Sequence, residues 1–178
     1  AYCIYCRTGS KRFPSKYCKA IINNTPMLNF IIKNATHFLP PENIFILTGD
    51  DASCDPIISI AKKYNISVLR GSEVYPVLRT FQVIKALKRL GFTHLCRICG
   101  DSPFYPFKYL EQLFTKACSK FNVLSDHLCI NNTLPKTYPN GVSIEFYPLN
   151  IIIDTISKHK DLCYSDSLTD IIKKQSDI

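Results

Sequence analysis

Four cations, one glycine and two serines lie between Arg7 and Lys16, directly after a short apolar run. The apolar run, residues 2–6, predicts a strand. A glycine just beyond a strand, here Gly9, lets the backbone turn with positive φ and approach a ligand closely. Free N–H groups in such a turn point at negative charge, and Arg7, Arg12 and Lys16 carry the cations to neutralise phosphate oxygens. We therefore predict a nucleoside triphosphate loop here.

Two common nucleotide motifs are absent from the chain. The sequence contains no Gly-x-x-x-x-Gly-Lys-Ser/Thr and no Gly-x-Gly-x-x-Gly, so neither the usual P-loop nor the dinucleotide fingerprint applies. Taken alone, the stretch from Arg7 to Lys16 is more typical of a basic, solvated loop than of a ligand site. The rest of the chain favours the ligand-binding interpretation.

Carboxylates that could complete a phosphate site occur later in the chain. Asp101 follows an apolar run and has Gly100 beside it, and Glu145 lies late in a second extended run. Phosphate chemistry on a nucleotide usually needs Mg²⁺, held by one or two carboxylates together with phosphate oxygens. We predict Asp101 and Glu145 as Mg²⁺ ligands. The alternatives are a turn or helix cap for Asp101 and a solvent-facing strand position for Glu145.

The elements that must position these residues alternate between strand and helix. This alternation predicts an α/β protein with a mostly parallel sheet covered on both faces. Ligands of such sheets bind beyond the carboxyl ends of the strands, where the strand order switches, so the loops at Arg7, Arg70 and Asp101 should converge. Strands are expected at residues 2–6, 44–48, 66–69, 93–98, 122–125 and 142–146, and helices from about 25, 55, 76, 106 and 151.

Composition limits the class of partner. The 178 residues carry a net charge of +8, which suits an anionic partner without choosing one. The cations form no run of five or more, so we expect no nucleic-acid partner. No apolar run reaches the roughly 20 residues of a membrane helix, so we expect no membrane partner either.

Nine cysteines are numerous for this length. Their number is odd and their spacing irregular, so we expect reduced thiols in a cytoplasmic protein. Cys3 with Cys6, and Cys96 with Cys99, have CxxC spacing that could suggest zinc. Both pairs lie in predicted strands, where residues three apart point to opposite faces, which argues against a zinc site.

Five blocks of this chain, in order, resemble a known family, the bacterial cytidylyltransferases of polysaccharide biosynthesis of the spore-coat type. These are relatives of the CMP-sialic acid and CMP-Kdo synthetases. The blocks span nearly the whole chain and are more specific together than any one alone. They are Arg7-Thr8-Gly9-Ser10-Lys11-Arg12-Phe13-Pro14-Ser15-Lys16, Asp55-Pro56-Ile57, Arg70-Gly71-Ser72-Glu73 with Val77-Leu78-Arg79, Arg97-Ile98-Cys99-Gly100-Asp101-Ser102-Pro103, and Tyr138-Pro139-Asn140-Gly141-Val142-Ser143-Ile144-Glu145.

The resemblance implies a three-layer, Rossmann-like nucleotide-diphospho-sugar transferase fold, and transfer of CMP from CTP to an acidic or modified sugar with release of pyrophosphate. Arg7, Lys16 and Asp101 would be catalytic, and Asp101 would bind Mg²⁺. Glu145 would lie by the metal or the sugar. The residues that would hold the nucleotide are Arg7, Gly9, Ser10, Arg12, Lys16, Arg70 and Ser72, and Arg79 would contact the sugar acceptor.

The sequence departs from the family pattern at several positions. Ser143 stands where the family usually has Asp, and Ser15 replaces a glycine, which we expect to be a milder change. Residues 165–169 match the family's Glu-His-Val-Thr poorly, and we expect one nucleotidyltransferase domain, residues 1–178, without the family's last segment. That segment contributes to dimer contacts in some relatives, and the resemblance also implies a possible homodimer.

Two other hypotheses stay open, the first of them because of these departures. One is a nucleotide-binding or regulatory homologue that has lost turnover. The other is a nucleic-acid-binding domain, which the net charge motivates and which predicts steep salt dependence.

Overall fold

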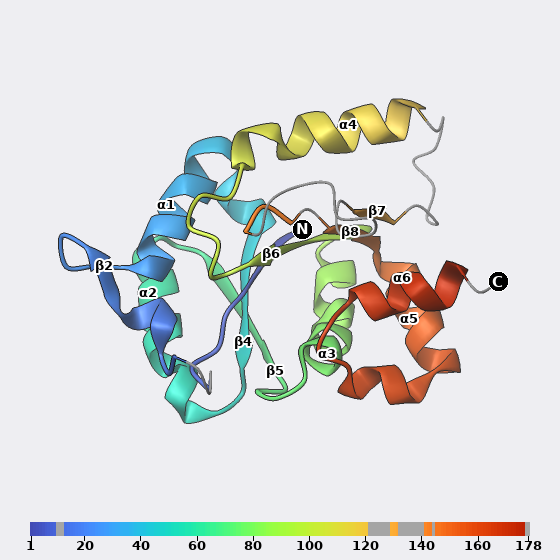
Figure 1. Ribbon diagram of the computed structural model, residues 1–178, viewed down its shortest axis with the longest axis horizontal. Coiled ribbons are helices and arrows are strands. Elements are labelled where there is room, and N and C mark those ends of the chain that lie inside the picture. Colours follow the sequence, from blue (N-terminus) through green and yellow to red (C-terminus); the bar gives the residue numbers. More distant parts are fainter. Residues whose placement is uncertain (10–12, 121–128, 132–140, 144, 177–178) are drawn as a thin grey trace.

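A six-stranded sheet forms the centre of the protein (Figure 1). The computed structural model describes residues 1–9, 13–120, 129–131, 141–143 and 145–176. The strand order is β5-β4-β1-β6-β8-β7, in which β5, β4, β1 and β6 are parallel, and β8 is antiparallel to both of its neighbours. The strands are β1 (Tyr2–Tyr5), β4 (Ile44–Gly49), β5 (Ser67–Gly71), β6 (His94–Cys99), β7 (Ile130–Asn131) and β8 (Glu145–Pro148).

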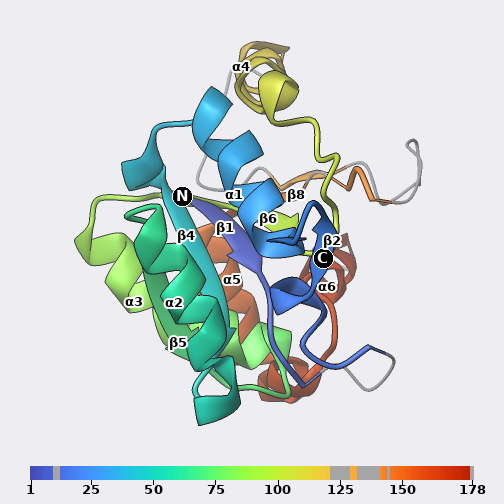
Figure 2. The same cartoon turned by 90° about the vertical axis from the view of Figure 1, so that its left-hand side faces the viewer.

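Helices cover both faces of this sheet, which confirms the three-layer α/β prediction. The helices α1 (Met27–Phe38) and α2 (Asp55–Lys63) pack on one face, and Figure 2 shows them in front of the strands. The other face is covered by α3 (Pro76–Arg89), α5 (Leu149–Lys158) and α6 (Thr169–Ser176). Each layer buries its own apolar cluster against the sheet.

Side chains along each strand alternate between these two clusters. In β1, Cys3 and Tyr5 join the cluster under α3 and α5, whereas Ile4, and Cys6 just after the strand, join the cluster under α1 and α2. Cys3 and Cys6 therefore lie on opposite faces, as the period of two requires. The cysteines that the structure describes are free thiols.

The strand order switches between β1 and β6. From β1 the chain first adds β4 and β5 on one side and then returns to add β6 on the other. Loops leaving the carboxyl ends of β1 and β6 consequently lie side by side at one edge of the sheet, where α/β sheets usually bind ligands. The Arg7 loop follows β1, and Asp101 follows β6.

Several predicted element boundaries moved. Thr25 and Pro26 form the strand β3 rather than the start of a helix, and they pair with β2 (Ala20–Ile22). Asn23 and Asn24 make the connecting turn with positive φ, which asparagine tolerates well. The strand predicted at residues 122–125 lies outside the described residues. Helix α3, which begins at Pro76, and the left-handed Gly91 just beyond its end agree with prediction.

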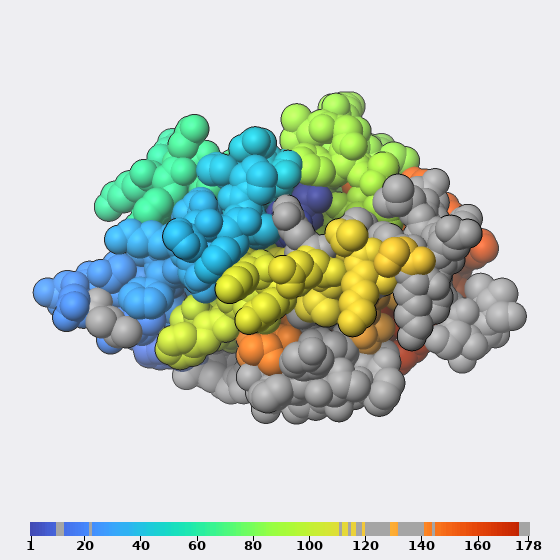
Figure 3. All heavy atoms as spheres, turned by 90° about the horizontal axis from the view of Figure 1, so that it is seen from above, coloured from blue at the N-terminus to red at the C-terminus, as the bar shows by residue number. Residues whose placement is uncertain are grey.

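Short 3-10 turns and one projecting helix complete the chain. Helix α4 (Leu110–Lys120) follows the turn η4 (Phe107–Tyr109), which lies beside α1, and Figure 3 shows this side of the molecule. The other turns are η1 (Lys16–Cys18), η2 (Pro41–Asn43), η3 (Ala52–Cys54) and η5 (Lys160–Tyr164). None of the helices in the described part of the chain is long and apolar enough to cross a membrane.

Candidate active site

Lys16 and Asp101 meet at the switch point of the sheet. The Lys16 ammonium donates to Asp101 Oδ2 at 2.5 Å, although 85 residues separate the two in sequence. The Asp101 side chain is 40% exposed and that of Lys16 17% exposed, so the pair borders solvent. The structure thus brings together two residues that the sequence predicts to be catalytic.

Gly100 allows this approach because it packs directly against the end of β1. A Cβ at Gly100 would lie 2.6 Å from the Tyr5 carbonyl oxygen and 3.0 Å from Cys6 Cβ. The Gly100 N–H also donates to the Tyr5 carbonyl at 3.0 Å. Any side chain at position 100 would push β6 from β1 and move Asp101 away from Lys16.

Ser15 shapes the turn that carries Lys16. Its backbone is left-handed, with φ 53° and ψ 26°, and its N–H donates to the Thr8 carbonyl at 3.0 Å. Left-handed backbone favours glycine, and a side chain there costs about 1–2 kcal/mol. The replacement of a glycine by Ser15 is therefore less mild than the sequence alone suggested.

The Cys99 thiol is the second partner of Asp101. Cys99 Sγ donates to Asp101 Oδ1 at 2.7 Å. Burial opposes ionisation of Asp101, but the Cys99 thiol and the Lys16 ammonium outweigh it, so the pKa of Asp101 is lowered. Burial, together with the Asp101 carboxylate, raises the pKa of Cys99 to about 11. Asp101 is thus a carboxylate, and Cys99 a protonated thiol, near neutral pH.

Arg7 and Gly9, at the start of the predicted triphosphate loop, both contact Glu73. Arg7 Nη1 donates to the Glu73 carbonyl at 2.9 Å, and the Gly9 N–H donates to Glu73 Oε1 at 2.9 Å. Ser10 and Arg12, the other predicted residues of this loop, lie outside the described residues. The structure therefore places the two ends of the loop, at Gly9 and at Lys16, against Glu73 and Asp101 respectively.

Arg79, on α3, is buried beneath the loop that follows β5 and carries Glu73. It is 2% exposed, and it donates from Nε to the Ser72 carbonyl at 2.8 Å and from Nη2 to the Glu73 carbonyl at 2.9 Å. Burial lowers the pKa of Arg79, and the nearby Glu73 carboxylate opposes that shift. Arg79 and Arg7 thus share one carbonyl oxygen, while the predicted contact of Arg79 with a sugar stays a prediction.

Arg70 and Ser72 lie at the end of β5, which is two strands away from β1 in the sheet and therefore remote from the Lys16–Asp101 pair. Arg70 Nη1 pairs with Asp55 at 3.0 Å, and its other donors reach the carbonyls of Gly49 and Asp51. The Ser72 N–H donates to Gln82 Oε1 at 2.7 Å. An open hollow of about 740 Å³ adjoins them, lined by Asp50, Asp51, Ser72, Glu73, Val74, Leu78 and Gln82.

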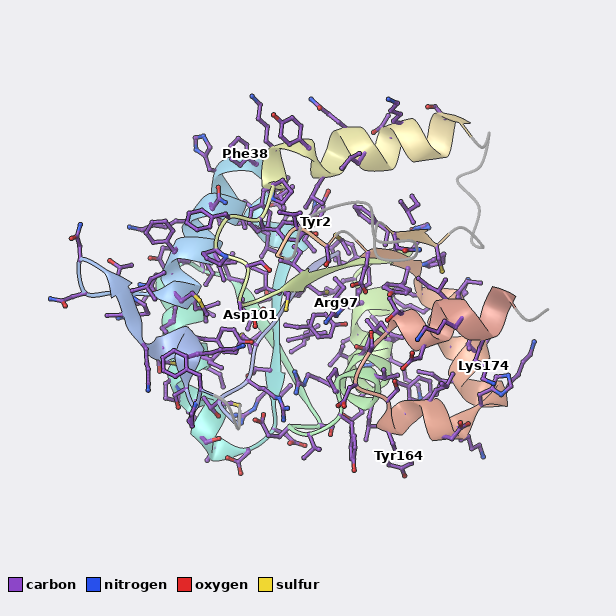
Figure 4. All side chains as sticks on the ribbon, viewed as in Figure 1. Tyr2, Phe38, Arg97, Asp101, Tyr164 and Lys174 are labelled. Carbon is purple, nitrogen blue, oxygen red and sulfur yellow. The ribbon has the colours of Figure 1, made fainter. Side chains whose placement is uncertain are left out.

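Glu145 is buried against Arg97 instead of facing solvent. Its exposure is 2%, because β8 lies inside the sheet, with Glu145 opposite Arg97 of β6. Arg97 Nη1 donates to Oε1 at 2.8 Å, and the Tyr147 hydroxyl donates to Oε2 at 2.7 Å. Both carboxylate oxygens already have a partner, so a metal ion at Glu145 would have to share them. Figure 4 shows Arg97 on the α3 side of Asp101.

The fit to Mg²⁺ differs between these two carboxylates. The two oxygens of Asp101 also have partners, Lys16 and Cys99, but they lie at the solvent border, where a cation shared with phosphate oxygens has access. Glu145 is enclosed, and its charge offsets that of Arg97. Among the described residues, no cluster of three or more His, Cys, Asp or Glu side chains is arranged to hold a metal ion.

Sequence reasoning missed Glu73 and Cys99 as members of the site. Glu73 lay within the Arg70–Glu73 block, but nothing local to it indicated that its carboxylate reaches the loop after β1. The spacing of Cys99 from Cys96 suggested only a zinc site. The i, i+2 spacing of Cys99 and Asp101 at a strand end was a signal that could have linked the two.

The fold and the site define an α/β protein of the three-layer, Rossmann-like type, with a basic loop and an aspartate at the switch point. A family model described as cytidylyltransferase matches residues 1–147. The chain belongs to the cytidylyltransferase family.

Individual relatives agree with this assignment. The spore coat polysaccharide biosynthesis protein SpsF of Bacillus subtilis (strain 168) is 27% identical over 157 residues, covering 86% of this chain and 60% of SpsF. A 3-deoxy-manno-octulosonate cytidylyltransferase of Alteromonas mediterranea is 29% identical over 109 residues, covering 61% of this chain and 42% of that protein. The chain thus spans about 60% or less of the length of these curated relatives.

Solved structures show the same fold. A cytidylyltransferase from Leptospira borgpetersenii superposes with a TM-score of 0.75 at 26% identity, covering 88% of this chain and 63% of that one. A CMP:2-keto-3-deoxy-manno-octonic acid synthetase, solved in complex with CTP, superposes with a TM-score of 0.60 at 15% identity, covering 86% and 75% of the two chains. The second likeness supports the fold alone.

Proposed function

We propose that this protein transfers CMP from CTP to a hydroxyl of a sugar in surface polysaccharide or glycan biosynthesis. In this reaction the hydroxyl oxygen forms a bond to the α-phosphorus. The bond between the α-phosphorus and the oxygen that bridges it to the β-phosphorus breaks, and that oxygen leaves with the pyrophosphate. The hydroxyl proton passes to solvent. The observation that carries the proposal is the meeting of Lys16 and Asp101 at the switch point of a cytidylyltransferase-family sheet.

The residues at this point can align and neutralise a triphosphate. Lys16 and Arg7 supply positive charge from the loop after β1, where phosphate oxygens become more negative as pyrophosphate departs. Holding the acceptor hydroxyl in line with the α-phosphorus contributes through orientation, with no covalent intermediate on the protein. Asp101 would hold Mg²⁺, which supplies charge neutralisation at the phosphate oxygens. Glu145 stays a proposed second ligand.

The acceptor is proposed to be an acidic or modified sugar. The support is indirect: SpsF is described as a spore coat polysaccharide protein, and the second curated relative as a 3-deoxy-manno-octulosonate cytidylyltransferase. A second candidate function is nucleotide binding without turnover. It is favoured by Ser143, which stands where the family pattern has Asp.

Asp101→Asn tests the site because its effect on CTP binding should reverse sign with Mg²⁺. Without Mg²⁺, the substitution releases Lys16 and removes a negative charge beside the phosphates, so CTP should bind up to about fivefold more tightly, the equivalent of an exposed ion pair. With Mg²⁺, wild type should gain affinity, whereas the variant should gain little. Calorimetry with CTP, ATP, GTP and UTP measures both effects and the base preference.

Asp154→Asn is the matched control, since Asp154 is exposed on α5. It should bind CTP as wild type does under both conditions. Equal Mg²⁺ responses in wild type and Asp101→Asn would contradict the metal role of Asp101. CTP binding without pyrophosphate release from any of a panel of acidic and neutral sugars would select the second candidate.

A further inference from the structure

The carboxylate of Glu73 joins the loops that follow three neighbouring strands. Glu73 itself follows β5, and its Oε1 accepts from the N–H of Gly9, which follows β1, at 2.9 Å. Its Oε2 accepts from the Cys54 thiol at 3.2 Å, in the turn η3 that follows β4. One side chain therefore contacts all three loops at the carboxyl edge of the sheet.

Two glycines make the space that this carboxylate occupies. A Cβ on Gly9 would lie 2.6 Å from Glu73 Oε1, and a Cβ on Gly49 would lie 1.8 Å from Glu73 Oε2. Atoms this close overlap, so an alanine at either position would displace the carboxylate. The backbone of Gly9 does not have the positive φ that the sequence suggested. The left-handed glycines of the described chain are Gly91 and Gly141. The absence of a side chain at Gly9 thus matters for the space it leaves to Glu73.

The backbone of Glu73 is held just as firmly as its side chain. Its carbonyl oxygen accepts from Arg7 Nη1 and from Arg79 Nη2, each at 2.9 Å. Arg79 is fixed by burial on α3 and by its second bond, to the Ser72 carbonyl. Arg79 consequently holds the backbone of Glu73 in place, and the Glu73 carboxylate faces the loop after β1.

We propose that Glu73 is a positioning residue for the triphosphate loop. Its carboxylate fixes Gly9 through a charge-assisted hydrogen bond, which is stronger than one between neutral groups, and its carbonyl orients the Arg7 guanidinium. Because the Gly9 N–H is bonded to Glu73, it fixes the course of the loop and is not available to the phosphates. The cationic side chains bind the phosphates. This inference rests on the proposed function, because it assumes that the loop binds the triphosphate of CTP.

The test compares Glu73→Ala with Glu73→Gln, and uses Glu42→Ala, an exposed glutamate of η2, as the matched control. Glutamine keeps an oxygen that can accept from the Gly9 N–H, whereas alanine does not. CTP affinity should fall about tenfold or more in Glu73→Ala, and should stay within about threefold of wild type in Glu73→Gln and Glu42→Ala. Binding is measured well below each variant's Tm, so a loss of stability alone does not change it.

A second readout does not depend on CTP. Hydrogen exchange of the Gly9 amide, followed by NMR, should be about tenfold faster or more in Glu73→Ala, and should rise less in Glu73→Gln, which keeps a neutral acceptor. If wild type binds no CTP, the proposed function fails and the Gly9 exchange rate alone decides the role of Glu73. An unchanged Gly9 exchange rate in folded Glu73→Ala, or unchanged CTP affinity in that variant where wild type binds CTP, would overturn the inference.

Discussion

Replacing Glu145 distinguishes two roles for its carboxylate, a structural one and a metal-binding one. Glu145 is buried and its two oxygens accept from Arg97 and Tyr147. Burial opposes the charge of Arg97, but the Glu145 carboxylate outweighs it, so the pKa of Arg97 is raised. Glu145→Ala leaves this guanidinium enclosed without its counter-charge, which is the costly way to break an ion pair.

The magnitude follows from the burial of the pair. Removing one partner of a buried pair costs about 3–5 kcal/mol, a large part of the 5–15 kcal/mol typical of a whole domain. Because a chain of this size loses roughly 2–4 °C of Tm per kcal/mol, Glu145→Ala should lower the Tm by roughly 6–20 °C. The Lys16–Asp101 pair borders solvent, with the Asp101 side chain 40% exposed, so Asp101→Ala should cost about 1 kcal/mol or less.

Thermal and urea unfolding of the two variants provide the comparison, with Glu145→Gln as the conservative control. Glutamine retains an acceptor for Arg97 and should lose less stability than alanine does. Mg²⁺ titration of CTP binding is then measured on folded Glu145→Gln. A small stability loss in Glu145→Ala, combined with a lost Mg²⁺ response in Glu145→Gln, would refute this reasoning and support Glu145 as a metal ligand.

Two further predictions concern the residues that flank the Lys16–Asp101 pair. Ser15→Gly should raise the free energy of unfolding by about 0.5–1 kcal/mol, because relief of the left-handed strain exceeds the added chain entropy. Asn65→Gly, also left-handed with φ 54°, should gain less, and a destabilised Ser15→Gly would contradict the strain argument. Cys99 should react slowly with iodoacetamide at pH 8 and faster as the pH rises, since its pKa is raised to about 11 by burial and by Asp101. Asp101→Asn should speed this alkylation, measured by mass spectrometry, and an unchanged rate would show that Asp101 does not suppress the thiolate.

The sequence was sufficient for the sheet and for placing the loops that carry Lys16 and Asp101 at one edge of it, whereas the ion pair between the two came from the structure. Strand and helix periodicity predicts parallel strands, and parallel strands put the loops after β1 and β6 at one edge. That inference needs only the order of elements along the chain. The prediction therefore held even where boundaries moved, as at Thr25 and Pro26.

The environment of single side chains was harder to predict, because it depends on contacts between distant loops. Arg79 was predicted to contact substrate, yet it is four residues before the buried Val83 and eight before the buried Leu87. That helical spacing is a signal for burial. Glu145 offered a similar signal, since it lies two residues before Tyr147 and therefore on the same face of β8, where both side chains are buried. No comparable pattern existed for Glu73. Its carboxylate occupies the space that Gly9 and Gly49 leave by having no side chain, and only the folded structure shows this.

These contacts divide the site into a movable half and a fixed half. Lys16 and Asp101 neutralise each other at the solvent border, and an exposed pair of this kind contributes little to stability. A triphosphate can therefore separate them at small cost and take Lys16 as its own partner. Glu73 is different, because its carbonyl is anchored by the buried Arg79 and its carboxylate fits between two glycines. Ligand binding should consequently rearrange the Lys16–Asp101 contact and leave the Glu73 contacts in place.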